Sequence, residues 1–240
     1  YHHRLEKEMP AGNSDTLRLP DVNRPSADIS EYSLRELLRD VKDSEGQTFF
    51  QSTREDIRAG DEALKRDAAA WAGTVDSIAA NGLPSSPVRM LSQTPLVLRL
   101  IGEDAVSKKI AAGGGVYAAP HVFDGTHPNM TPEMWKQIPA AMADPIAVFD
   151  SDSPAGRAKG DLVFMLELTD ANGATVVVPV ALDVARGRKQ AHVNIVKSAY
   201  SKESGGVPSN HWFMRQLKKN ARYVNGQKME PWLRAAGAAS

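Results

Sequence analysis

Apolar residues recur three and four positions apart over a long stretch in the first half of the chain. Between residues 31 and 80, the segments EYSLRELLRDV and DEALKRDAAAWAGTVDSIAA show this spacing, which is typical of helices that bury one face. The segment NGLPSSP then ends the helical pattern, because glycine and proline interrupt helices. Residues 1–28 are rich in Pro, Asn, Asp and Ser and show no period, which indicates an extended arm. We therefore expect an arm over 1–28, a helical lead-in region over 29–105 and a further domain over 106–240.

The second half of the chain combines a clear helix start with β-rich runs. Thr131, Pro132 and Glu133 form a good start, since threonine caps helices, proline fits the first turn and glutamate favours the positive end of the dipole. The segment IAVFD then predicts a strand. The runs DLVFMLEL and ATVVVPVALD flank TDANG, whose Asn-Gly pair is typical of a hairpin turn. Pro179 in the second run predicts an edge strand or a bulge, because proline cannot donate to a ladder.

A third β-rich run, AHVNIVKSAY, covers residues 191–200 and alternates in polarity. One face of a strand would carry its apolar members, which are Val193, Ile195 and Ala199. The other face would carry its polar members, which are His192, Asn194, Ser198 and Tyr200. We expect this polar face to line something other than the core. The pattern as a whole predicts an α+β protein, in which a helical N-terminal region precedes a mainly antiparallel sheet of about four strands flanked by helices.

Composition narrows the functional classes. The chain has 29 basic and 29 acidic residues among 240, so the molecule as a whole is not a polycation that binds nucleic acid without specificity. Between residues 184 and 228, however, ten Lys or Arg residues accompany one acid, Glu203. This zone predicts either a solvated helix face or a phosphate-binding surface. The lack of cysteine excludes disulfides and thiolate chemistry, and no apolar run has the roughly 18 residues that a membrane span needs.

Several phrases of the second half, taken in order, resemble a known family. They are HPNMTPEMWKQIPAAMADPIAVFDS, LVFMLELTDANGATVVVPVALD, NIVKSAYSK and ARYVNGQK. Together they resemble the MuF C-terminal domain of phage head-associated proteins and polymorphic toxins, which is grouped with the barnase, EndoU, colicin D and RelE-like nucleases. The resemblance spans roughly residues 51–228.

The resemblance implies a metal-independent endoribonuclease that acts as a toxin or effector and forms cyclic phosphate ends. It implies RNA as substrate, with tRNA among the candidates, and a cognate immunity protein as partner. No cofactor, metal, nucleotide or membrane is expected. Such a domain would act in the cytoplasm of a target cell after secretion or phage-associated delivery.

The resemblance also assigns roles to individual residues. His127 matches the histidine ahead of the helix and is our candidate acid or base, since imidazole exchanges protons near neutral pH. Ser198 and Tyr200 match the family's strand end and would donate to the phosphate, and Lys202 would offset its growing charge. From their positions on the strand and on the following helix, rather than from the resemblance, we expect a further set of residues to bind substrate, with His211 an alternative acid: Asn194, Lys197, His211, Arg215 and Lys219. If this interpretation holds, His127 should lie close to Ser198 or Tyr200.

Other chemistries receive less support. His121, Asp124 and His127 lie close in sequence, but metal sites usually offer tighter spacings or cysteines. The G-x-S-x-G motif of many serine hydrolases does not occur, and other orders of a catalytic triad stay open. A Glu-x-Glu motif typical of ADP-ribosyltransferases does not follow the hairpin. The main alternative is a non-catalytic phage or virion-associated module that keeps the same fold and binds a partner.

Overall fold

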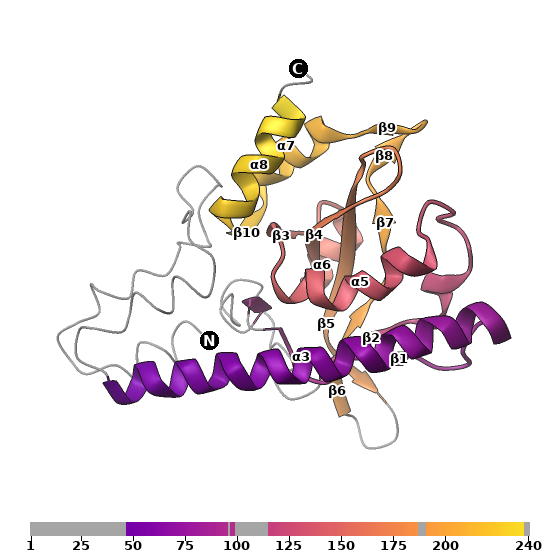
Figure 1. Ribbon diagram of the computed structural model, residues 1–240. Coiled ribbons are helices and arrows are strands. Elements are labelled where there is room, and N and C mark those ends of the chain that lie inside the picture. Colours follow the sequence, from indigo (N-terminus) through magenta and orange to yellow (C-terminus); the bar gives the residue numbers. More distant parts are fainter. Residues whose placement is uncertain (1–46, 96, 99–114, 187–190, 238–240) are drawn as a thin grey trace.

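A computed structural model describes residues 47–95, 97–98, 115–186 and 191–237 (Figure 1). The predicted arm over 1–28 lies outside these residues. The elements are α3 (Gln47–Asn81), β1 (Val88–Leu91), β2 (Val116–Ala118), η2 (Pro120–Phe123), α5 (Pro132–Ala143), β3 (Ala147–Asp150), α6 (Pro154–Lys159), β4 (Leu162–Thr169), β5 (Thr175–Arg186), β6 (Ala191–Val196), β7 (Tyr200–Ser201), β8 (Glu203–Ser204), β9 (Val207–Pro208), α7 (Asn210–Lys219), β10 (Ala221–Val224) and α8 (Gly226–Gly237).

The main sheet has eight strands, more than the four or so that the sequence predicts. Its order is β1-β2-β6-β5-β4-β3-β10, and β7 pairs with β5. The pairs are antiparallel except for β2 and β6, which are parallel. The undercount has a simple cause, because β1, β2 and β7 have only two to four residues each and such runs are too short to show alternation. The segment RYVNG was expected to form a short strand, and β10 confirms it. The α+β class and the mainly antiparallel sheet are confirmed.

Both faces of the sheet are covered by helices. In β4, Leu162 and Phe164 belong to the core cluster that contains Trp135 of α5, whereas Met165 belongs to a second cluster with Phe213 of α7. Figure 1 shows α3 and α5 on one side of the strands and α7 and α8 on the other. Two covered faces explain why β4 and β5 read as nearly continuous apolar runs rather than as alternating ones. No helix among the described residues is long and apolar enough to cross a membrane.

Helix α3 is tied to the sheet by one tryptophan. Trp71 is 1% exposed, and its indole N–H donates to the Trp135 carbonyl of α5 at 2.8 Å. Phe123 packs against both indoles, with ring centroids 5.9 Å from Trp71 and 4.8 Å from Trp135. An ion pair between Lys136 and Asp76, at 2.8 Å, links the same two helices at the surface. The helical lead-in therefore contributes to the core that supports the sheet.

Replacement of Trp71 with alanine is expected to lower the free energy of unfolding by about 3–5 kcal/mol, because it opens a cavity and leaves the Trp135 carbonyl without its donor. Urea unfolding followed by circular dichroism measures this loss. Lys65→Ala, an exposed site on the same helix, is the matched control and should change stability by less than about 0.5 kcal/mol. A similarly small effect of Trp71→Ala would show that α3 is not part of the folded core.

The turn between β4 and β5 is confirmed: Gly173 has φ of 77°, and Asp170 Oδ1 accepts the Asn172 and Ala174 amides at 2.9 and 3.0 Å. Pro179 does not lie in an edge strand, because β5 pairs with both β4 and β6. Its carbonyl accepts the Lys197 amide at 2.9 Å. The backbone nitrogen and carbonyl of one residue point to the same side of a strand. The nitrogen of Pro179, which has no hydrogen to donate, therefore faces the break between β6 and β7, where no strand pairing requires a donor.

Candidate functional site

The loop before α5 fixes the position of His127. Thr131 Oγ1 accepts the Met134 amide at 3.2 Å and Pro132 occupies the first turn, so the predicted helix start is confirmed. Immediately upstream, the His127 carbonyl accepts the Met130 amide at 3.0 Å. The short turn and the capped helix after it fix the backbone position from which the His127 side chain projects. His127 thus lies in a constrained loop.

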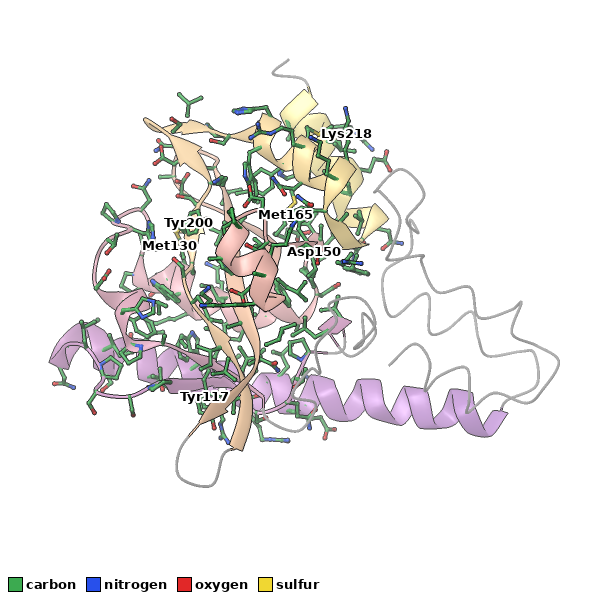
Figure 2. The ribbon with its side chains drawn as sticks, turned by 180° about the vertical axis from the view of Figure 1, so that it is seen from behind. Tyr117, Met130, Asp150, Met165, Tyr200 and Lys218 are labelled. Carbon is green, nitrogen blue, oxygen red and sulfur yellow. The ribbon has the colours of Figure 1, made fainter. Side chains whose placement is uncertain are left out.

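The structure brings His127 together with Ser198 and Tyr200. His127 Nε2 lies 3.4 Å from Ser198 Oγ, and its ring stacks on the Tyr200 ring with centroids 5.0 Å apart and planes at 25°. All three side chains are half-buried. Met130 and Tyr200, both labelled in Figure 2, mark the two chain segments that meet here. The predicted proximity of His127 to Ser198 and Tyr200 is confirmed.

Lys202 extends this cluster toward α7. Its Nζ lies 4.4 Å from the centroid of the Trp212 ring and 5.8 Å from that of Tyr200, within the range of cation–π contacts. Within the described part of the chain, no carboxylate forms an ion pair with Lys202. Its charge is therefore held in place by aromatic rings rather than neutralised by an acid. We call His127, Ser198, Tyr200 and Lys202 the His127 cluster.

Tyr200 carries an electrostatic perturbation. Burial raises the pKa of its phenol, and the nearby Asp152 carboxylate raises that pKa further. Both effects penalise the phenolate. At physiological pH the Tyr200 hydroxyl is therefore protonated and able to donate a hydrogen bond.

Lys197 organises the break in the strand that carries Ser198. Its amide donates to the Pro179 carbonyl at 2.9 Å, and its own carbonyl lies 2.9 Å from His121 Nε2. Its ammonium pairs at 2.6 Å with the Asp161 carboxylate, whose side chain is 3% exposed. A lysine committed to a buried carboxylate is poorly placed to serve a phosphate as well. The structure thus shows Lys197 paired with Asp161, and its contact with substrate stays a prediction.

Asn194 does not share the surface of Ser198 and Tyr200. It is 0% exposed, and its amide donates to the Gly115 carbonyl at 3.2 Å and to Thr94 Oγ1 at 3.3 Å. The expectation of one continuous polar face over residues 192–200 is wrong, because Val196 lies in the core and the ladder stops there. Period-two alternation cannot anticipate such a break.

Residues 122–231 match the phage MuF C-terminal domain. The matched region, referred to below as the MuF region, begins in η2 and ends in α8. It contains the whole His127 cluster, and it is shorter than the span of roughly 51–228 over which we saw the resemblance. No curated protein and no solved structure matches the chain.

Helix α7 of the MuF region presents the remaining predicted residues to solvent. His211, Arg215 and Lys219 are all exposed, and no side-chain contact joins them to His127 within the described residues. At 3.6 residues per turn, Arg215 and Lys219 form a row next to the one that carries Trp212 and Gln216. His211 precedes Arg215 by four residues and lies on the same exposed row, and no contact among the described residues brings any of the three into the His127 cluster.

Beside the site lie three residues of the MuF region that we did not expect there: Asp152, Trp212 and Gln216. Asp152 Oδ2 accepts the Trp212 indole N–H at 3.0 Å and the Gln216 amide at 3.2 Å. The i, i+4 spacing of Trp212 and Gln216 was a usable signal, because it places both donors on one helix row. Asp152 follows β3 in a serine-rich turn, and nothing local distinguishes it from a turn residue.

The acids near His127 do not form a metal site. Among the described residues, no group of three or more His, Cys, Asp or Glu is arranged to hold an ion. Asp124 accepts both the amide and the hydroxyl of Thr126. These bonds, with smaller contributions from His121 and His127, lower the pKa of its carboxyl group. Asp124 is thus directed to Thr126 rather than to the imidazole.

Proposed function

We propose that the MuF region is a metal-independent endoribonuclease that cleaves RNA by attack of a 2′-hydroxyl on the neighbouring phosphate. The proposal rests on one observation, the contact of His127 Nε2 with Ser198 Oγ at 3.4 Å in a cluster completed by Tyr200 and Lys202. A proton carrier, two hydroxyl donors and an uncompensated cation are the groups that such a reaction requires.

Each of the four side chains has its own role in the proposed reaction. His127 takes the proton of the 2′-hydroxyl as the 2′-oxygen bonds to phosphorus. Ser198 and Lys202 stabilise the negative charge that grows on the non-bridging oxygens. The bond to the 5′-oxygen breaks, and the Tyr200 hydroxyl, which is protonated before the reaction, gives its proton to that departing oxygen. The His127 imidazolium and the Tyr200 phenolate then return to their starting forms by exchanging protons with water. The products are a 2′,3′-cyclic phosphate and a free 5′-hydroxyl.

The surroundings of the cluster support RNA as the substrate. Arg215 and Lys219 are exposed on the row next to Trp212, where they would attract the phosphates on either side of the cut. The resemblance to toxins of the barnase, EndoU, colicin D and RelE-like group extends the proposal. The protein would act in the cytoplasm of a target cell as a toxin or effector, and a cognate immunity protein would inhibit it.

The test is to incubate purified protein with total RNA and with a tRNA pool in excess chelator, and to map the ends. We expect cleavage that leaves cyclic phosphates, since no step uses a metal. If folded protein leaves the RNA intact, the ribonuclease proposal is wrong, and a non-catalytic phage or virion-associated binding module becomes the better interpretation.

A serine beside a histidine could also act as the nucleophile of an acyl-transfer enzyme. Substitution of Ser198 distinguishes that alternative from RNA cleavage. In the ribonuclease Ser198 is one donor among three groups, so Ser198→Ala should slow RNA cleavage by roughly 10- to 100-fold without abolishing it. Ser204→Ala, at an exposed site on β8, is the control and should keep the wild-type rate. Labelling of the wild type by a fluorophosphonate, lost in Ser198→Ala, would instead support a serine hydrolase.

A further inference from the structure

A directed chain of hydrogen bonds ends at Asp152, outside the His127 cluster. Arg157 donates to Asn220 Oδ1, and Asn220 Nδ2 donates to Gln216 Oε1 at 2.6 Å. Gln216 Nε2 then donates to Asp152 Oδ2 at 3.2 Å. Each amide accepts on one side and donates on the other, so the arginine sets the orientation of both. The chain holds the Asp152 carboxylate in one position.

Only one oxygen of this carboxylate is occupied. Both donors, Gln216 and the Trp212 indole at 3.0 Å, bind Oδ2. Oδ1 has no hydrogen-bond partner among the described residues, and the residue is exposed. An oriented carboxylate with a free oxygen is an acceptor ready for a ligand that carries N–H or O–H groups.

Asp152 lies at the edge of the His127 cluster. The Trp212 indole donates to Asp152 Oδ2, and the centroid of the same indole ring lies 4.4 Å from Lys202 Nζ. The negative charge of Asp152 also contributes to the raised pKa of Tyr200. A negative charge repels phosphates, so it weakens RNA binding unless a part of the substrate other than phosphate meets it. The other parts of RNA that carry hydrogen-bond donors are the sugar and the bases.

We propose that Asp152 reads the base next to the scissile phosphate and selects guanine; this inference rests on the proposed ribonuclease function. The Watson–Crick edge of guanine presents two adjacent donors, N1–H and the N2 amino group, which match the two open lone-pair sites of Oδ1. Uracil offers one donor between two carbonyl oxygens, which the carboxylate repels. Adenine and cytosine offer one amino group beside an acceptor.

The proposal predicts a change of preference as well as a loss. In Asp152→Asn the amide oxygen would stay on the Trp212 and Gln216 donors, so the NH₂ group would face the base. The variant should then favour bases that present acceptors, uracil above all. We expect the wild type to favour guanine over uracil by about 10- to 100-fold, as single base contacts of this kind do, and Asp152→Asn to remove or reverse that ratio.

Two measurements test this. Cleavage sites are counted on an RNA pool of balanced composition for the wild type, Asp152→Asn and Glu230→Gln, an exposed control on α8 with the same loss of charge. Calorimetric titration with guanosine and uridine 3′-monophosphates reports base preference without cleavage. Guanine preference in the wild type and Glu230→Gln, lost in Asp152→Asn, supports the proposal. If the wild type and both variants show the same base preference, the base-reading role of Asp152 is wrong. That result is the one expected if Asp152 instead binds a protein partner.

The two proposals can fail separately. If the wild type does not cleave RNA, the ribonuclease function is lost, and the titration still decides the role of Asp152. Equal affinity of the wild type for the two nucleotides would then overturn the base-reading role. If RNA is cleaved without base preference, the ribonuclease stands and only the role of Asp152 is wrong.

Discussion

His127→Ala is expected to slow RNA cleavage by about 10²- to 10⁴-fold, the range for loss of a positioned acid or base. The imidazole lies 3.4 Å from Ser198 Oγ and stacks on Tyr200, and neither His121 nor His211 contacts these two side chains. His211 is exposed on α7 and His121 bonds to the Lys197 carbonyl. Neither is placed to replace the missing base.

The measurement is the initial rate of cleavage of one defined RNA in excess chelator. His127→Asn is the sharper variant, because it keeps a polar side chain near Ser198 but cannot carry a proton at neutral pH. Asn129→Ala, an exposed change two residues away in the same loop, controls for loop damage and should keep the wild-type rate. Rates of His127→Asn and Asn129→Ala that agree would exclude His127 as the proton carrier.

Local signals in the sequence predicted the parts of the fold that depend on neighbouring residues. The start of α5 was predictable because Thr131 and Pro132 act within one turn of helix. The hairpin was predictable because Gly173 must adopt a positive φ. The same kind of information placed His127 just ahead of a helix, and the family resemblance, not periodicity, linked it to Ser198 and Tyr200.

The features that the sequence did not predict depend on partners far along the chain. Asn194 looked like a surface residue until Thr94 and Gly115 were seen to satisfy its amide in the core. Lys197 looked free until Asp161, distant in sequence, took its charge. A strand pattern reports which side a residue faces but not what covers that side.

Because Lys197 is paired with Asp161, Lys202 is the cation that the described residues place at the His127 cluster. Arg215 and Lys219 lie on the exposed row of α7, where they suit long-range attraction of RNA better than contact with the reacting phosphate. Lys202 instead sits over Trp212 and near Tyr200. In the proposed ribonuclease, Lys202 would therefore stabilise the charge of the transition state.

Lys202→Met is expected to lower kcat by about 10²- to 10³-fold with little change in KM, because the lost charge acts mainly on the transition state. Methionine keeps an unbranched chain that can pack on the Trp212 ring, so the variant separates charge from packing. Lys218→Met, an exposed change on α7 (Figure 2), is the matched control. Steady-state kinetics on one RNA at several salt concentrations measures kcat and KM for the two variants. A higher KM with unchanged kcat, and a salt dependence weakened by about one charge, would make Lys202 a binding contact and leave the charge on the phosphate to another group.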